Sequence, residues 1–199
     1  MAMRSRLEQY LSALPRALDS FADCRAKGSL IRTSLQVRPL TRSAALPAPL
    51  ASHVRSPPLA SQWVPEVHYV ALSLATADKH AMDGPAFASF WREVMLALTD
   101  GTYSSLLGLL HPETPIRGVS SRWSYFHEGS ALTARKQSHG LRLELDVPDG
   151  LFHELILDGY TGVIQGLIDR SRKPEGRASR VLTTARAGRT LAQYDLSGW

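Results

Sequence analysis

The sequence predicts an α+β fold in which a helical layer packs on a four-stranded, twisted antiparallel sheet. Apolar residues recur at the helical spacing of three and four through much of residues 4–128, and the spacing changes to two over residues 141–147. A further helical segment then separates two pairs of predicted strands. The expected order of elements is therefore helices, β, β, α, β, β.

Composition excludes several classes of protein. Of the 199 residues, 44% are hydrophobic and 21% are charged, which is typical of a globular domain and not of a disordered chain. No run of 18 apolar residues is present, so we expect no membrane-spanning helix. The single cysteine, Cys24, cannot form an internal disulfide, and polar residues interrupt the stretch where a signal peptide would be apolar. We therefore expect a cytoplasmic protein.

Residues 1–26 are predicted to form an amphipathic helical extension. Their apolar residues recur at spacings of four and three and so share one stripe, while Pro15 predicts a kink. The stripe either packs on the rest of the chain or binds a protein partner, which would make a homo-oligomer the expected state. The apolar stripe consists of Leu7, Leu11, Leu14, Leu18 and Phe21. Residues 27–199 are predicted to form a single α+β ligand-binding-like domain.

Helices dominate the next hundred residues. Residues 30–37 fit either a strand or a helix, and six of the 12 prolines lie between Pro39 and Pro65, which excludes one long helix there. Apolar periodicity and turn residues predict the remaining helices over 47–55, from Pro57 onward, and over 64–81, 85–99, 103–110 and 115–128.

The last third of the chain supplies the predicted sheet. Alternating apolar and polar residues over 141–147 are typical of a half-buried strand, and residues 131–137 are its expected hairpin partner. The last two strands are expected over 178–185 and 190–197, on either side of a turn at Ala187-Gly188.

A long helix is predicted between the two strand pairs, over residues 149–172, with Asp149 as its cap. Each glycine inside a helix costs about 1 kcal/mol relative to alanine, so several together indicate a close backbone approach. We expect this helix to pack closely against the sheet through Gly159, Gly162 and Gly166.

No motif for catalysis or cofactor binding is present. The chain lacks a nucleophile elbow, a glycine-rich phosphate loop and a zinc-type histidine pair. We therefore expect no catalytic residues, no metal and no cofactor, and we do not expect haem. One alternative is an enzyme that acts on an apolar metabolite, with His127 or His153 and a carboxylate performing acid–base chemistry.

Residues 122–129 are the most aromatic stretch of the chain. These side chains either fill the core or wall an apolar ligand cavity between helix and sheet, and a ligand pocket is itself mostly apolar. The candidate pocket residues are Trp123, Tyr125, Phe126, His127, Phe152 and Tyr160.

The net charge of +5 is concentrated in residues 170–189, which hold seven basic residues and one acidic residue. This stretch fits a solvated face, a surface for an acidic partner, or a nucleic-acid contact. Aromatic residues that could stack on bases are not interleaved with it, so nucleic acid is not the expected partner. The candidate basic surface consists of Arg172, Lys173, Arg177, Arg180, Arg186 and Arg189.

Over residues 27–199 the chain resembles a large paralogous family of uncharacterised myxobacterial proteins. The resemblance rests on Lys27-Gly28, Trp63-Val64-Pro65, His111-Pro112-Glu113, the Trp123-x-x-Phe126-x-x-Gly129 pattern and a last strand that ends at Trp199. That family is distantly similar to the superfamily of 4-vinyl-reductase domains, haem–nitric-oxide-binding domains and TRAPP subunits. The resemblance implies helices on a strongly twisted antiparallel sheet, with an enclosed apolar pocket or an oligomer surface. None of the seven histidines matches the haem branch's proximal motif.

These observations predict a non-catalytic, cytoplasmic small-molecule-sensing or protein-interaction module with an apolar pocket. Its expected partners are an apolar small molecule and a second copy of the chain or another protein. The enzyme described above is one alternative, and nucleic-acid association through the basic C-terminal region is a second.

Overall fold

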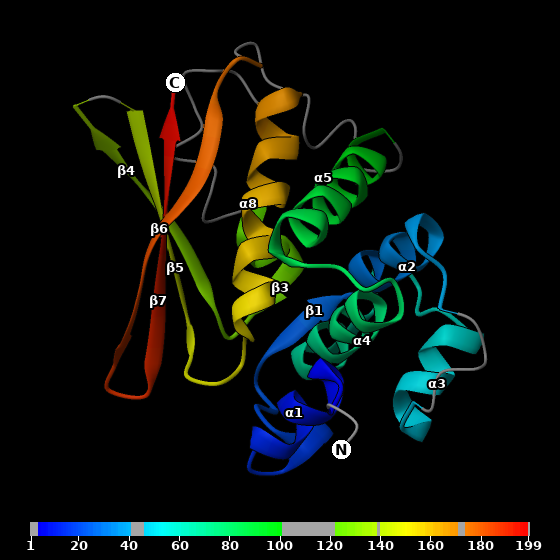
Figure 1. Ribbon diagram of the computed structural model, residues 1–199. Helices are drawn as coiled ribbons and strands as arrows, with labels where there is room; N and C mark the ends of the chain where they lie inside the picture. The colour runs from blue at the N-terminus through cyan, green and yellow to red at the C-terminus, as the bar shows by residue number, and fades with distance from the viewer. Residues whose placement is uncertain (1–3, 41–45, 101–121, 139, 171–173, 199) are drawn as a thin grey trace.

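The computed structural model describes residues 4–40, 46–100, 122–138, 140–170 and 174–198. The fold is α+β, as predicted. The larger sheet is antiparallel and has the order β4-β5-β7-β6. Figure 1 shows α8 lying against this sheet, with the other helices on the far side of α8. The strands are β4 (Ala131–Gln137), β5 (Gly140–Pro148), β6 (Arg177–Arg186) and β7 (Arg189–Ser197), and α8 spans Glu154–Asp169.

The alternation of side chains in β5 explains why the sheet forms where it was predicted. Leu141, Leu143 and Leu145 are at most 4% exposed and face the core, together with Ala192 and Tyr194 of β7. The intervening polar residues interact with each other on the other face, where Arg142 donates two hydrogen bonds of 2.7 and 2.8 Å to Asp195. All four strands in this sheet were predicted, to within a residue or two at their ends.

Helix α8 is shorter than predicted, and it packs against a different element. Its cap is His153, whose Nδ1 accepts a hydrogen bond from the Leu155 amide, and not Asp149. The three glycines contact α5 (Gly84–Asp100) and not the sheet. A Cβ atom on Gly162 would lie 1.8 Å from the carbonyl oxygen of Ala88, so only glycine allows the two helices to approach this closely.

The central helices are α2 (Gly28–Val37), α3 (Ala48–Arg55) and α4 (Glu66–Lys79). Residues 30–37, which fitted either a strand or a helix, belong to helix α2. Helices α3 and α5 form where they were predicted. The prediction of a helix from Pro57 onward is wrong, because this segment leads into strand β2 (Trp63–Pro65). Helix α4 begins directly after β2. The helix predicted over 103–110 lies outside the described residues. The one predicted over 115–128 is helical at 122–126 and gives way to strand β3 (His127–Glu128).

A second, three-stranded sheet was not predicted. Its strands have the order β2-β1-β3, and β1 (Arg25–Lys27) pairs antiparallel with both neighbours. Ala26 at its centre lies opposite Val64 on one side and His127 on the other. Strands of two and three residues are too short to produce an alternating pattern, so the sequence carries little signal for them.

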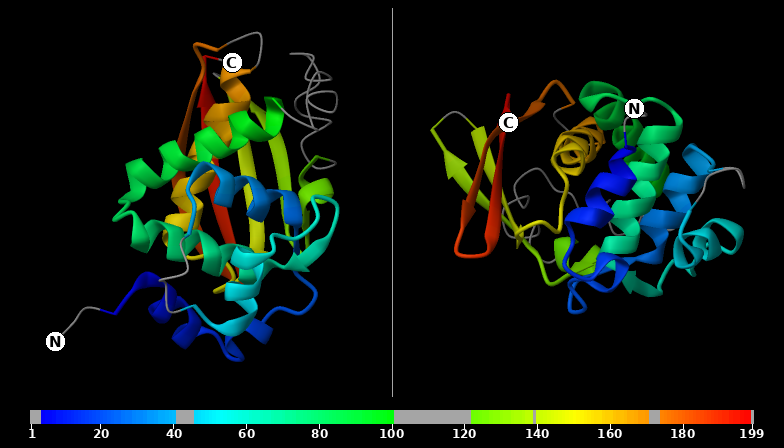
Figure 2. Two further views of the ribbon diagram at one scale, coloured as in Figure 1. Left: turned by 90° about the vertical axis from the view of Figure 1, so that its right-hand side faces the viewer. Right: turned by 60° about the horizontal axis from the view of Figure 1, so that its bottom comes forward.

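The N-terminal segment is not one helix to residue 26. Helix α1 (Arg6–Ala13) begins with a capping box between Ser5 and Glu8 and stops before Pro15, and a short 3₁₀ turn η1 (Ala17–Asp19) follows. Helix α1 lies along α4 (Figure 2), and the apolar stripe of residues 7–21 packs against the core of the same chain. Leu7 and Leu14 are buried, and Leu11, Leu18 and Phe21 are partly buried against the core. No helix among the described residues is long and apolar enough to cross a bilayer.

Candidate functional site: a buried polar and aromatic cluster

The smaller sheet brings a carboxylate and an imidazole together inside the molecule. Glu66 is the first residue of α4, directly after β2, and His127 lies on β3. Strand β1 lies between these two strands: Ala26 pairs with His127, and the Glu66 amide donates a 2.9 Å hydrogen bond to the Cys24 carbonyl oxygen. His127 Nδ1 lies 2.9 Å from one Glu66 carboxylate oxygen and 3.2 Å from the other. Glu66 is 0% exposed and His127 is 4% exposed.

Aromatic rings enclose this pair. The Trp123 ring stacks on His127 with 4.0 Å between centroids and an interplanar angle of 17°. Tyr69 of α4 and Tyr160 of α8 meet the His127 ring edge-on, at 5.9 and 6.2 Å. The indole nitrogen of Trp123 donates a 3.0 Å hydrogen bond to the Ser130 hydroxyl, which fixes the plane of the stack.

One polar atom in this cluster lacks a well-formed hydrogen bond. The Tyr160 hydroxyl is fully buried, and no described group meets it at hydrogen-bond geometry, although it interacts with the Tyr69 phenol. Tyr160 is 4% exposed and its ring contacts Trp123 at 5.3 Å and Phe152 at 5.5 Å. A buried hydroxyl without a partner costs about 1–3 kcal/mol, so most buried hydroxyls in proteins are satisfied.

The field of the Glu66 carboxylate reaches the phenols and the thiol around it. Burial raises the pKa of Tyr69 above its ordinary value, and Glu66 raises it further. Burial also raises the pKa of Tyr160, with Tyr69 and Glu66 adding to the shift. Burial, and after it the charge of Glu66, also raises the pKa values of Tyr10 and Cys24. Each of these groups therefore keeps its proton, and the phenols are hydrogen-bond donors.

The structure brings four of the six predicted pocket residues together: Trp123, His127, Phe152 and Tyr160 are joined by ring contacts. The other two make a ring contact with each other. Tyr125 is 42% exposed and contacts Phe126, which is partly buried against the core. Whether these residues contact a ligand stays a prediction.

Sequence reasoning missed Glu66 and Tyr69. A glutamate directly after a proline at the start of a helix is usually an exposed residue that interacts with the helix dipole. Nothing local distinguishes Glu66 from that case. His127 was itself singled out in the sequence, but its partner lies 61 residues away. No local pattern therefore connects the two residues.

The basic C-terminal segment is partly neutralised by carboxylates. Arg180 contacts Glu154 at 2.7 Å and Asp158 at 2.9 Å, and Arg189 contacts Asp146 at 2.8 Å. Arg177 donates to backbone carbonyl oxygens of residues 174–176, and Arg186 is exposed at the end of β6. Arg172 and Lys173 lie outside the described residues. Two of the four described arginines of this candidate surface, Arg180 and Arg189, thus form ion pairs, and the surface is not uniformly basic.

No protein-family model and no curated protein matches the chain. Solved structures with the same fold do exist, and they are H-NOX domains. An oxygen-binding H-NOX domain related to soluble guanylate cyclases has a TM-score of 0.56 and 8% identity, over 85% of this chain and 91% of that chain. An H-NOX variant designated Cs, which carries 4-cyano-L-phenylalanine, has a TM-score of 0.56 and 12% identity, over 86% and 95%.

A third solved structure corrects the cofactor prediction. It comes from work on haem redox potential and porphyrin distortion, with a TM-score of 0.55 and 10% identity over 85% of this chain and 96% of that chain. The expectation of no cofactor, with haem not expected, is overturned at the level of the fold, because solved structures that share the fold come from work on haem in H-NOX proteins. At these identities the likeness shows the fold.

Proposed function

We propose that this chain is a non-catalytic small-molecule-sensing module whose guest lies against the cluster of Trp123, His127, Phe152 and Tyr160. The observation that carries this proposal is the buried hydroxyl of Tyr160, which lacks a well-formed hydrogen bond. Pockets for small molecules are mostly apolar and contain few polar groups, which fix the guest's orientation. A guest with an apolar body and one hydrogen-bond acceptor would satisfy that hydroxyl and stack among the rings.

Gas- or haem-dependent sensing is what the H-NOX names suggest, but the described residues do not fit haem. Haem iron takes an axial histidine, cysteine, methionine or tyrosine. The rings of His53 and His68 bind each other, His153 caps α8, His80 is exposed, and His127 binds Glu66 beneath Trp123. The other two histidines, His111 and His139, lie outside the described residues. No step of this proposal passes through haem.

The buried Glu66–His127 pair is the one observation that favours the enzyme alternative. A carboxylate that orients a histidine is a common arrangement in acid–base catalysis. A general base must, however, reach its substrate, and the stacked Trp123 ring covers one face of this imidazole at 4.0 Å. We propose that the pair acts instead as a support that holds Trp123 and the two tyrosines in place.

Membership in the myxobacterial family and a cytoplasmic location are also proposals. Two glycines of the resemblance motifs have structural roles, which supports them as fold determinants. A Cβ atom on Gly28 would lie 2.3 Å from the Leu59 carbonyl oxygen, and Gly129 adopts φ 79° directly over Cys24. The unpaired Cys24 is buried, which suits a reducing compartment.

Native mass spectrometry of the purified protein tests the proposed function. We expect a retained small molecule in the wild-type protein and its loss from Tyr160→Phe, which keeps the ring and removes the hydroxyl. Tyr194→Phe is the matched control, because its buried hydroxyl already donates to the Leu157 carbonyl oxygen at 2.9 Å. Retention that is equal in wild type and Tyr160→Phe would contradict the assignment. A Soret band in the protein as purified would show that the guest is haem, and turnover that disappears in His127→Gln would show an enzyme.

A further inference from the structure

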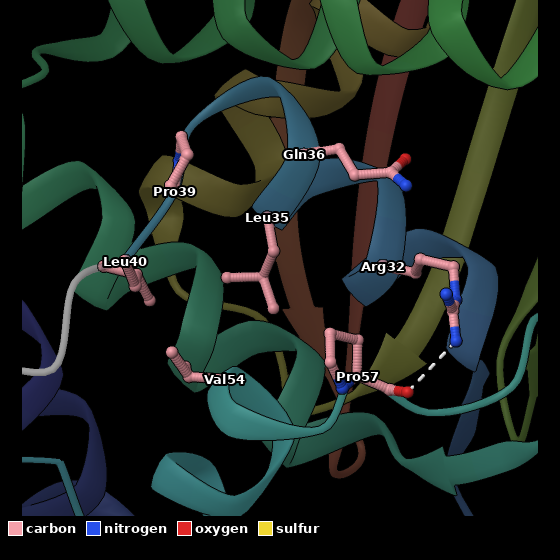
Figure 3. Close-up of a pocket in the computed structure, with 7 residues that line it drawn as sticks. All are labelled: Arg32, Leu35, Gln36, Pro39, Leu40, Val54 and Pro57. Carbon is pink, nitrogen blue, oxygen red and sulfur yellow. Dashed lines mark hydrogen bonds between the residues drawn. The ribbon is translucent and has the colours of Figure 1, made fainter.

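A surface groove between α2 and α3 has the features of a second binding site. It has a volume of about 190 Å³ and is lined by Arg32, Leu35 and Gln36 of α2, Val54 of α3, and Pro39, Leu40 and Pro57. Figure 3 shows Leu35, Leu40 and Val54 turned toward a common space, with Arg32 at the other end beside Pro57. None of these residues belongs to the aromatic cluster, so this inference is independent of the proposed function.

Arg32 supplies a charge that the described part of the chain does not neutralise. Its Nε donates to the Pro58 carbonyl oxygen at 3.1 Å and its Nη2 to the Pro57 carbonyl oxygen at 3.2 Å. Carbonyl oxygens fix the orientation of the guanidinium but carry no net charge. No described carboxylate lies within ion-pair distance of Arg32. By contrast, Arg38, which caps the C-terminus of the same helix, pairs with Glu93 at 3.0 Å.

The remaining donors of Arg32 suit one kind of ligand. A guanidinium has five N–H groups, and two are occupied, which leaves three for an acceptor. Carboxylates match the planar fork of arginine, and a guanidinium already held in place loses little entropy on binding. The apolar side chains beside it suit a hydrocarbon tail. The groove is smaller than the roughly 300–1,000 Å³ typical of drug-sized ligands, so the tail must be short.

We propose that this groove binds small amphipathic monocarboxylates, with the carboxylate on Arg32 and the tail against Leu35, Leu40 and Val54. Charge complementarity identifies the occupant, and the small volume limits it to a short tail.

The test is a titration of the full chain with hexanoate, hexan-1-ol and hexylamine, followed by backbone amide chemical shifts. We expect saturable hexanoate binding in the millimolar range or tighter, with the shifts centred on residues 32–40 and 54–57. Hexan-1-ol should bind at least tenfold more weakly, and hexylamine should not bind. Equal binding of hexanoate and hexan-1-ol, or no hexanoate binding, overturns the proposal.

Variants locate the site. Arg32→Gln should weaken hexanoate at least tenfold, while Arg55→Gln, which removes the same charge from an exposed position of α3, should not. Because Arg32 also tethers the Pro57-Pro58 segment, Val54→Phe is a second variant that leaves the tether and fills the groove. Unchanged affinity in both Arg32→Gln and Val54→Phe would place the carboxylate elsewhere and overturn the assignment.

Discussion

Glu66 and His127 form a hydrogen-bonded pair at 2.9 Å although 61 residues separate them, and both are buried. The pair joins the start of α4 to strand β3 and lies under Trp123. It therefore connects the helical layer to the residues that precede the larger sheet. If it is the support we infer, its loss should affect the stability of the whole domain.

Replacement of either partner is expected to destabilise the fold. Glu66→Leu or His127→Phe should each lower the free energy of unfolding by about 3 kcal/mol, because each leaves its buried partner without a hydrogen bond. The double variant should lose less than the sum of the two, with a coupling of about 1–3 kcal/mol. Chemical denaturation of the four proteins measures this cycle, and strict additivity would show that the contact contributes nothing.

The contact between α5 and α8 depends on glycine. Gly162→Ala should lower the free energy of unfolding by about 1–3 kcal/mol, since the added methyl group meets the backbone carbonyl of Ala88 and the helices must move apart. Gly166→Ala is the control, because its added Cβ would lie 3.0 Å from Met95 Cβ and 3.2 Å from the nearest backbone atom. It should cost less than Gly162→Ala. The reverse order in thermal denaturation would refute this account of the packing.

The turn between β6 and β7 contains strain that can be removed. Ala187 adopts φ 45°, which is unfavourable for alanine and is tolerated by glycine and asparagine. Ala187→Asn should therefore raise the free energy of unfolding by about 0.5–1 kcal/mol. Ala185→Gly, at an exposed position of β6 two residues earlier, should lower it. Equal effects of the two changes would show that backbone conformation does not decide the outcome.

The contact between His53 and His68 predicts a dependence of stability on pH. Burial and the neighbouring His53 lower the pKa of His68 to about 4, from 6.5 in the unfolded chain. The neutral ring is thus favoured in the folded state, so its contribution is complete above about pH 6.5 and declines as the pH falls toward 4. We expect a loss of about 1–2 kcal/mol over this range, because solvent around the partly exposed ring screens part of the shift.

Denaturation curves at several pH values measure this effect. The difference in stability between wild type and His68→Gln should shrink from pH 7 to pH 4. His80→Gln, at an exposed site, should follow the wild-type curve. A difference that is constant with pH would show that His68 does not titrate differently in the folded and unfolded chains.

The parts of this fold that could be predicted are those with long periodic patterns. Strand β5 alternates apolar and polar residues over 141–147, and α5 carries an apolar face along a helix of 17 residues, so both were found. The three-stranded sheet was missed because its strands have two or three residues each. The partner of the α8 glycines was misjudged because close packing on a helix and on a sheet both require small residues. The candidate site depends on a contact between distant residues, for which one sequence carries no signal.

The unfolding free energies of Tyr160→Phe and Tyr194→Phe, measured on ligand-free protein, test the central claim most directly. Both variants remove one buried hydroxyl, but only that of Tyr194 makes a hydrogen bond among the described residues. We predict a loss of about 1–2 kcal/mol for Tyr194→Phe and no loss, or a gain, for Tyr160→Phe. Equal losses would mean that the Tyr160 hydroxyl is already satisfied within the protein, which would contradict a guest site at this position.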